Sequence, residues 1–361
     1  MKKILLFCTS SASIITFRKT FIEKLQKENY QVTAVAFDNE RKEDVEKLGV
    51  EFICLEDQNR SVNPLRILSL KKRYKRLIKQ IAPDVVFTFM LKPNTFGVFA
   101  AKSMKVPKIF SMVEGAGDVF INQSLKWKII RFVVCGLYKK ALKNCKKVFF
   151  LNQDDRAEFI KRKLVKKEQC ELVHGIGMDL EHFAYKPLVN ERNFLMIARM
   201  LKTKGVMEYC EAARIVKKTY PDASFDYLGG EGTITVSDIQ EYIDDGSLNY
   251  LGTTSDVRPY LEACTAYVLP SYREGMSVSI MEAECVGRAI ITSNVPGCRE
   301  SIEEGVNGVF ATTPQEIAKQ AIWLIENPKK AREMGENSRK FAEKHLDKHK
   351  INERVVRIIE Q

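Results

Sequence analysis

Short apolar runs that are typical of buried strands alternate with helical patterns along almost the whole chain. This order predicts parallel sheets, because two parallel neighbouring strands need a crossover connection and that crossover is usually a helix. The predicted strands of the first half are 3–8, 32–37, 51–55, 85–89, 108–113 and 148–151, and those of the second half are 194–197, 224–228, 249–251, 266–269, 289–291 and 309–311. We therefore expect an α/β fold built on parallel sheets.

A break in this alternation divides the chain in two. The segment 183–193 contains Pro187 and polar neighbours, and the strand–helix pattern restarts after it. A chain of 361 residues is long enough for two domains with full hydrophobic cores. We predict a Rossmann-like domain over residues 1–185, a second Rossmann-like domain over residues 186–340, and a charged helical tail over residues 341–361.

The segment 271–287, S-Y-R-E-G-M-S-V-S-I-M-E-A-E-C-V-G, places a glycine turn and a helix start directly after a predicted strand. Free backbone N–H groups and the helix dipole favour an anion at such a helix start, so a phosphate fits there. Two carboxylates, Glu274 and Glu282, bracket this start. Because carboxylates repel a phosphate but accept hydrogen bonds from hydroxyls, the segment predicts a site for a sugar nucleotide.

Paired glutamates also occur in glycoside hydrolases, where the distance between the two carboxyl groups is restricted. A retaining hydrolase needs two carboxyl groups about 5 Å apart, on either side of one glycosidic bond. Eight residues of mostly helical rise place Glu274 and Glu282 about 12 Å apart along the helix axis. The spacing therefore favours two contacts along one extended ligand over a hydrolytic pair.

Basic residues gather in the first half of the chain. The formal net charge of the whole chain is +12. Residues 1–185 contain 35 Lys and Arg against 20 Asp and Glu, while residues 186–361 contain 23 against 26. The basic excess therefore lies entirely in the first predicted domain, and it indicates a polyanionic partner such as an anionic membrane or a nucleic acid.

Two basic helical segments concentrate this charge, and both suit an anionic membrane surface. In the segment 65–79, lysines and arginines surround one apolar face, formed by Leu65, Leu68, Tyr74, Leu77 and Ile78. In the segment 125–147, lysines flank an apolar middle, and the residues expected to enter the interface are Trp127, Ile130 and Val134. No nucleic-acid motif is present, so nucleic acid is not expected as a partner. Ordinary packed helices with solvated lysines remain the alternative.

Nine cysteines are scattered singly, without C-x-x-C pairs or metal-ligand spacing. This distribution is typical of reduced cytosolic thiols. The segment 1–8 has the two lysines and the apolar run of a signal peptide, but the run is short, so a first buried strand is the better interpretation. No apolar stretch in the sequence reaches the roughly 18 residues of a membrane-spanning helix.

The spacing of Glu274 and Glu282 within L-P-S-Y-R-E-G-M-S-V-S-I-M-E-A resembles that of glycosyltransferase family 4. Similar stretches are I-A-R-M-L-K-T-K-G at 197–205, Y-L-G-G-E-G at 227–232, Y-L-G-T-T-S-D-V at 250–257 and N-G-V-F at 307–310. The family consists of retaining enzymes that use nucleotide-sugar donors. The resemblance implies the GT-B fold, in which two Rossmann-like domains face an interdomain cleft.

Two stretches of the first half narrow this resemblance. K-P-N-T-F-G-V-F-A-A-K at 92–102 and V-E-G-A-G-D-V-F at 113–120 are similar to family members that extend undecaprenyl-diphosphate-linked sugars. The nearest likeness is to the α-1,3-N-acetylgalactosaminyltransferases that act on an undecaprenyl-diphospho-bacillosamine. The resemblance thus implies a lipid-linked acceptor.

The donor site is expected on the second domain. Arg199 and Lys204 follow a strand at a glycine-marked helix start, where two cations can neutralise a diphosphate and stabilise its departure. The resemblance assigns them this catalytic role together with Glu274, which would contact hydroxyls of the donor sugar, while Glu282 would accept hydrogen bonds from the ribose. The remaining donor contacts are expected from the helix start and from a glycine cluster, and they are Gly275, Met276, Ser277, Val278 and Gly230.

The acceptor site is expected on the first domain, where the chain departs from the family. Many members carry a histidine in the loop after the fourth strand, and here Leu91 stands at that place, beside Lys92. A retaining transferase can do without a protein base if the leaving phosphate takes the acceptor proton. Polar and charged residues near the ends of predicted strands are the candidate acceptor contacts, and they are Ser11, Ser13, Arg18, Lys92, Glu114 and Asp118.

These features predict a retaining hexosyltransferase that moves a hexose or N-acetylhexosamine from a UDP-sugar to a polyprenyl-diphosphate-linked sugar in bacterial surface-glycan or glycoprotein-glycan assembly. We expect a peripheral protein at the cytoplasmic face of the inner membrane. We expect no cofactor and no metal, because no D-x-D carboxylate pair follows a strand. The alternatives are a GT-B-fold sugar-nucleotide epimerase and a non-catalytic sugar-nucleotide-binding protein.

Overall fold

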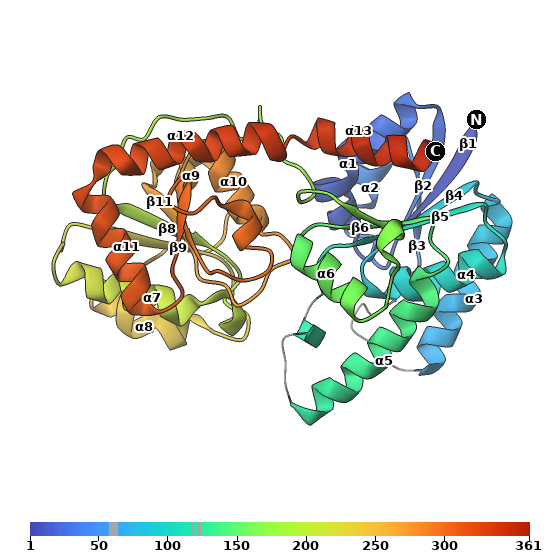
Figure 1. The fold of residues 1–361 in the computed structure, drawn as a ribbon, viewed down its shortest axis with the longest axis horizontal. Coiled ribbons are helices and arrows are strands. Elements are labelled where there is room, and N and C mark those ends of the chain that lie inside the picture. The colour runs from blue at the N-terminus through green and yellow to red at the C-terminus, as the bar shows by residue number, and fades with distance from the viewer. Residues whose placement is uncertain (58–63, 117, 121–123) are drawn as a thin grey trace. The chain divides into compact units, whose positions relative to one another are not determined.

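The computed structural model describes residues 1–57, 64–116, 118–120 and 124–361, except for the side chains of Pro64, Leu65 and Asp118. The chain forms two compact units (Figure 1). The first unit comprises Met1–Ile176 together with Lys348–Gln361, and the second comprises Gly177–Asp347.

A parallel sheet of seven strands forms the centre of the first unit, in the order β3-β2-β1-β4-β5-β6-β7 within the described residues. Its strands are β1 (Lys2–Phe7), β2 (Tyr30–Ala36), β3 (Glu51–Cys54), β4 (Val85–Phe89), β5 (Lys108–Val113), β6 (Lys147–Phe150) and β7 (Cys170–Leu172). The central strands β1, β4 and β5 are mostly apolar and buried because both faces of the sheet are covered, as in other all-parallel sheets.

Helices pack on the two faces of this sheet. Helices α1 (Ser11–Lys27), α2 (Lys42–Glu46) and α13 (Lys348–Glu360) pack together on one face, and α3 (Pro64–Ile81), α4 (Val98–Ser103) and α5 (Leu125–Leu142) pack together on the other (Figure 1). The remaining elements are α6 (Gln153–Lys161) and the short turns η1 (Pro93–Gly97), η2 (Asp118–Phe120) and η3 (Lys167–Gln169).

The second unit repeats this architecture around a parallel sheet of six strands, in the order β10-β9-β8-β11-β12-β13. Its strands are β8 (Asn193–Ile197), β9 (Ser224–Leu228), β10 (Asn249–Tyr250), β11 (Ala266–Leu269), β12 (Ala289–Thr292) and β13 (Gly308–Phe310). The order reverses direction at β8, and ligands of open parallel sheets bind beyond the carboxyl ends of the strands at such a point.

Helices again cover the sheet of the second unit from both sides (Figure 1). They are α7 (Val206–Lys217), α8 (Val236–Asp244), α9 (Arg258–Ala263), α10 (Val278–Val286), α11 (Pro314–Glu326) and α12 (Pro328–His345), with the short turns η4 (Lys202–Lys204) and η5 (Arg299–Ser301). The doubly wound α/β architecture that the alternation predicts is therefore confirmed in both units. The sequence pattern misses β7, because its three residues are too few to show a period.

The observed division of the chain differs from the expected one at both boundaries. The first unit ends at Ile176, and the last fourteen residues, Lys348–Gln361, return to it. Helix α13 packs against α1, and the Lys108 ammonium of β5 donates to the carbonyl oxygens of Ile359 and Glu360 at 2.9 Å each. The expected tail is therefore divided, because α12 continues past residue 341 in the second unit. The charged sequence of the tail does not reveal which surface each of its helices covers.

Candidate functional site

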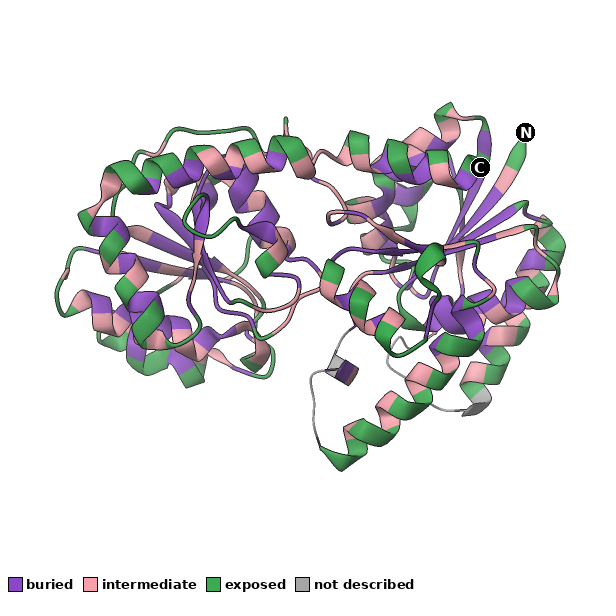
Figure 2. Cartoon of the chain, viewed as in Figure 1, coloured by how far each residue is buried: buried purple, intermediate pink, exposed green. Residues whose placement is uncertain are grey.

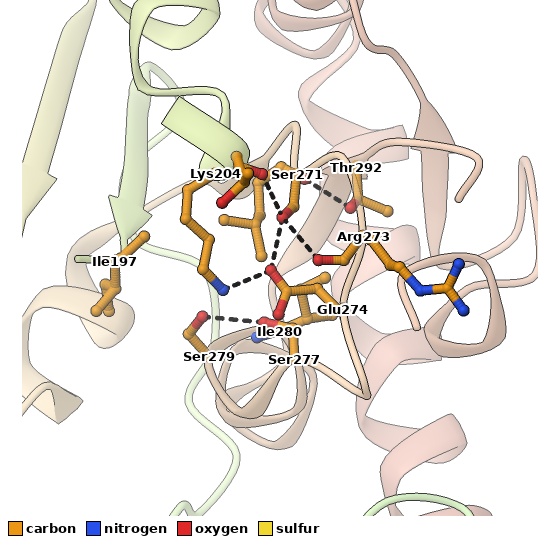
Figure 3. A network of polar contacts seen from close by, with 12 residues as sticks. Ile197, Lys204, Ser271, Arg273, Glu274, Ser277, Ser279, Ile280 and Thr292 are labelled. Carbon is orange, nitrogen blue, oxygen red and sulfur yellow. Dashed lines mark hydrogen bonds and ion pairs between the residues drawn. The ribbon is translucent and has the colours of Figure 1, made fainter. Parts of the chain in front are cut away.

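Lys204 and Glu274 meet at one edge of the second unit's sheet, although they are 70 residues apart in the sequence. Lys204 follows β8 and Glu274 follows β11, and these strands are parallel neighbours whose carboxyl ends share an edge. The Lys204 Nζ lies 2.5 Å from the Glu274 Oε1 (Figure 3). The two side chains are 25% and 11% exposed, so the ion pair faces solvent only in part.

Two glycines let the loops of this edge approach one another. Gly205 has a φ of +75° and ends the turn η4, and a Cβ there would overlap the Pro270 carbonyl oxygen. Gly297 has a φ of +79°, and a Cβ there would overlap the backbone of Glu274. Both positions favour glycine for their backbone conformation and also for their close contacts. The two glycines thus allow the backbones of these loops to pack in direct contact near Lys204 and Glu274.

The Ser271 side chain lies where the same two loops meet. Its hydroxyl is fully buried and lies 2.6 Å from the Glu274 Oε1 and 3.0 Å from the carbonyl oxygen of Thr203 (Figure 3). A backbone bond from the Tyr272 N–H to the Thr203 oxygen, at 2.9 Å, runs beside it. Ser271 stands in the motif but was not among the predicted site residues, because a serine before a turn is usually only a turn residue.

Arg199 also lies at this edge, just after β8. Its side chain is exposed, and within the described part of the chain it has no hydrogen-bond or ion-pair partner. An exposed guanidinium of this kind keeps all its N–H donors available for an anionic group. The structure therefore places both predicted diphosphate-binding cations after the same strand.

The start of α10 supplies backbone donors rather than side-chain donors. Ser277 is its N-cap, and the Ser277 hydroxyl accepts a hydrogen bond from the Ile280 N–H at 3.4 Å. Met276 is buried at 7% exposure, and Gly275 and Val278 flank the cap. The first N–H groups of a helix have no acceptor inside the helix, so this turn can bind an anion or a sugar hydroxyl.

Glu282 lies inside α10 and is only partly exposed. Among the described residues its carboxyl group has no hydrogen-bond partner. Burial disfavours the charged form, and it raises the pKa of Glu282 from 4.5 to about 7. A carboxylate held in this way is suited to a ligand that brings its own hydroxyl donors.

Gly230 follows β9 and belongs to the same edge. Its carbonyl oxygen accepts from the Met200 N–H at 2.8 Å, which joins the loop after β9 to the loop after β8. A Cβ at Gly230 would lie 3.4 Å from the Thr253 side chain, which is an ordinary van der Waals contact. All the predicted donor residues thus lie on the loops after β8, β9 and β11 and on helix α10.

Arg18 and Glu114 form an ion pair in the first unit, where both were expected to contact the acceptor. Their side chains are 5% and 17% exposed, and the Arg18 guanidinium also lies 4.1 Å from the centre of the Phe89 ring. The loop that follows Glu114 is fixed by Asp155, whose carboxylate accepts from the Ala116 N–H at 3.0 Å. Arg18 therefore compensates Glu114, and a contact of Arg18 with a diphosphate would require the guanidinium to share its donors with this carboxylate.

Lys92 is likewise buried and paired. Its Nζ lies 2.7 Å from the Asp57 Oδ2, and the two side chains are 9% and 4% exposed. Asp57 follows β3, and no sequence pattern marked it as the partner of a lysine after β4. The expected contact between Lys92 and a diphosphate would thus require Asp57 to share or release the ammonium.

The three other expected acceptor residues differ in their surroundings. The Ser11 hydroxyl is fully buried and bonded to Asp38, and it accepts from the Arg41 N–H at 3.0 Å, so a ligand contact would require these groups to move. The Ser13 hydroxyl donates to the Ser10 carbonyl at 2.7 Å within the first turn of α1. The side chain of Asp118 lies outside the described residues.

Helix α5 exposes a stripe of large apolar side chains. The stripe consists of Leu125 at 76% exposure, Ile129 at 59%, Phe132 at 81% and Val133 at 54%. Figure 2 shows exposed residues along most of this helix. The residues expected on this face, Trp127, Ile130 and Val134, are instead only partly exposed. The apolar stripe is therefore present, but it lies on a different face of α5.

Helix α3 also differs from its expected packing. Leu70, Tyr74 and Ile78 form its buried face, with one residue at each turn, whereas Leu68 is 57% exposed. The expected face included Leu68 and omitted Leu70. None of the helices in the described part of the chain combines the length and the apolar character that crossing a membrane requires.

Two family models match the chain, one in each half. The model of the group 1 glycosyl transferases matches residues 178–341, and the model of the glycosyl transferase 4-like family matches residues 3–152. Each match falls entirely within one of the two compact units.

Two relatives and one solved structure are similar over much of the chain. An N,N'-diacetylbacillosaminyl-diphospho-undecaprenol alpha-1,3-N-acetylgalactosaminyltransferase of Campylobacter jejuni is 30% identical, over 98% of this chain and 96% of the relative. A UDP-Gal:alpha-D-GlcNAc-diphosphoundecaprenol alpha-1,3-galactosyltransferase of Escherichia coli is 30% identical, over 63% and 62%. The structure of Anabaena Alr3699/HepE in complex with UDP and glucose has a TM-score of 0.82 at 17% identity, and it covers 100% of both chains.

Proposed function

The chain belongs to the glycosyltransferase family of the group 1 and 4-like models and has the GT-B fold, and from this premise we propose that it transfers a sugar from a UDP-sugar to a polyprenyl-diphosphate-linked sugar with retention of configuration. The transferred sugar is a hexose or an N-acetylhexosamine. The observation that carries the proposal is the ion pair of Lys204 and Glu274 beside the exposed Arg199. This arrangement combines cations for a diphosphate with a carboxylate for sugar hydroxyls.

The cations would act on the leaving group. As the bond between sugar and diphosphate breaks, negative charge grows on the diphosphate, and Arg199 and Lys204 stabilise it. The N–H groups at the start of α10 add donors at the same edge. Glu282 accepts from the ribose, and Glu274 accepts from the donor sugar. The leaving phosphate then takes the proton of the acceptor hydroxyl, so the reaction needs no histidine at the position of Leu91.

The nature of the acceptor is supported by the relatives. The names of both relatives given above specify a sugar diphospho-undecaprenol as the acceptor. In the first unit, Glu114 is the best-placed acceptor contact, because Arg18 keeps it fixed and its side chain remains 17% exposed. We assign Glu114 to a hydroxyl of the acceptor sugar. A sugar-nucleotide epimerase has no such support, because the named relatives are transferases.

Membrane docking is the second part of the proposal. The acceptor lipid anchors its sugar at a bilayer surface, and the first unit presents the apolar stripe of α5 together with the lysines of that helix. An amphipathic helix of this kind buries its apolar residues in the interface while its cations attract anionic lipids. We propose that α5 docks the enzyme peripherally on the cytoplasmic face of the inner membrane.

A transfer assay with purified enzyme tests the proposal. The enzyme is incubated with a panel of UDP-sugars and short-chain polyprenyl-diphospho-sugars, and both UDP release and elongated lipid are measured. We expect UDP release that depends on the acceptor and a product one sugar longer. Reactions without acceptor and reactions with the Lys204→Ala variant are the controls. UDP release without any elongated product, with every acceptor, would contradict the transferase assignment.

The same assay tests the expectation that no metal is needed. Activity should survive treatment with a chelator, because Arg199 and Lys204 supply the positive charge that a metal would otherwise bring. A complete loss of activity that Mg²⁺ or Mn²⁺ restores would contradict this expectation.

A further inference from the structure

The Glu274 carboxylate has two oxygens that differ in their surroundings. Oε1 accepts from the Lys204 ammonium at 2.5 Å and from the Ser271 hydroxyl at 2.6 Å. Within the described part of the chain, Oε2 has no hydrogen-bond partner. One oxygen is thus occupied by the protein, and the other is left for a ligand.

Ser271 contacts the same carboxylate oxygen as Lys204 does. Its side chain has no exposed surface, and its hydroxyl lies 2.6 Å from Glu274 Oε1, 3.0 Å from the Thr203 carbonyl oxygen and 3.5 Å from the Arg273 carbonyl oxygen. A hydroxyl donates only one proton. The shorter contact and the negative charge both favour Glu274 Oε1 over Thr203 as its acceptor, because bonds to charged acceptors are shorter and stronger.

We infer that Ser271 is a positioning residue for donor recognition: it holds Glu274 Oε1 together with Lys204, and so presents Oε2 to the hydroxyls of the donor sugar. This inference rests on the proposed function and deepens it. Without Ser271 the carboxylate can rotate, and either oxygen can turn toward Lys204. The sugar contact is then lost for part of the time, while the cations that face the diphosphate remain.

The inference predicts a separation between two measurements. UDP carries the ribose and the diphosphate but not the transferred sugar, so its binding does not need Glu274 Oε2. The Ser271→Ala variant should therefore bind UDP within about twofold of the wild type. Its turnover with the UDP-sugar should fall about 10-fold to 100-fold, the range that the loss of a hydrogen bond to a charged group produces. The Ser271→Thr variant keeps the hydroxyl and should recover most of this loss.

Thr292 offers a matched control, because it is another buried hydroxyl near the same edge. It is fully buried at the end of β12, and its Oγ1 donates to the Leu269 carbonyl at 2.7 Å, without any contact to Glu274 (Figure 3). The Thr292→Val variant should lower the melting temperature about as much as Ser271→Ala does. It should leave the ratio of turnover to UDP affinity unchanged.

Binding is measured by isothermal titration with UDP, and turnover is measured under saturating acceptor. If Ser271→Ala weakens UDP binding and turnover in equal proportion, or if Thr292→Val gives the same separation, Ser271 is a structural residue and the inference is wrong. If the wild-type enzyme does not bind UDP at all, the result contradicts the proposed function itself, whatever the role of Ser271. The two failures are therefore distinguishable in one set of titrations.

Discussion

Arg199 and Lys204 are the residues on which the donor site depends most directly. Arg199 is exposed after β8, and Lys204 pairs with Glu274. We expect Arg199→Ala and Lys204→Ala each to lower turnover about 10²-fold to 10³-fold, the usual cost of a lost charge-stabilising group. The melting temperature should change little, because both side chains are partly or largely exposed. Steady-state kinetics measure the turnover, and thermal unfolding measures the melting temperature. Turnover near that of the wild type in both variants would contradict the assignment of Arg199 and Lys204 to the donor site.

Glu282 gives the donor site a pH dependence. Its pKa is raised to about 7 by burial, so below pH 7 the free enzyme holds the carboxyl largely protonated. Ribose hydroxyls donate best to the ionised form, so donor affinity should rise with pH, and KM for the UDP-sugar should be about ten times higher at pH 6 than at pH 8. The Glu282→Gln variant should show a flat profile over this range. An unchanged profile in that variant would assign the titration to another group.

The same raised pKa affects stability in the opposite direction. Below pH 4.5 Glu282 is protonated in the folded and the unfolded chain, so it adds no pH dependence to the free energy of unfolding. Between pH 4.5 and 7 the unfolded chain ionises while the folded carboxyl stays neutral, so the free energy of unfolding falls as pH rises through this window. Glu282→Gln should abolish this contribution, which urea unfolding at pH 5 and pH 7.5 can measure.

Among the elements, α5 carries the membrane prediction. We expect the wild type to float with anionic liposomes at low salt, and Phe132→Asp or the pair Lys126→Glu and Lys128→Glu to reduce the bound fraction strongly, at about 1 kcal/mol per well-placed cation. The matched control reverses Lys218 and Lys329, which are exposed in the second unit. Equal loss of binding in that control would mean that net charge, rather than α5, drives association.

The sequence predicted the elements better than it predicted their faces. Helix α5 is apolar almost all round in its middle, so periodicity could not distinguish the face of Ile130 from the face of Phe132. In α3, for the same reason, Leu68 was predicted on the apolar face, whereas Leu70 is the buried residue. Which face is buried depends on the neighbouring elements, and a helical pattern contains no information about them.

In the candidate site, too, some features were predictable from the sequence and others were not. The donor residues stand in short motifs after strands, and parallel strands place such motifs at one edge, so they were predictable. The partners of Lys92 and Arg18 were not, since Asp57 and Glu114 come from loops after other strands. An ion pair between distant segments depends on strand order, and the sequence pattern does not give that order.

For the molecule as a whole, the return of α13 to the first unit has a measurable effect on stability. Val355, Val356 and Ile359 are buried there at 1%, 1% and 0% exposure. Ile359→Ala should cost about 2–5 kcal/mol. At about 2–4 °C per kcal/mol for a unit of this size, the melting temperature should fall by roughly 4–20 °C. Arg357→Ala on the exposed face of the same helix is the control, and an equal loss there would contradict the packing of α13.

The return of α13 also sets an order of events during synthesis. The ribosome completes the strands of the first unit early, but it makes Lys348–Gln361 only after the whole second unit, Gly177–Asp347. At about 5–20 residues per second, the 171 residues between them take roughly 9–34 s. During that time the surface of α1 that α13 later covers is open to water. A nascent chain of this protein therefore exposes the apolar surface of α1 until α13 emerges.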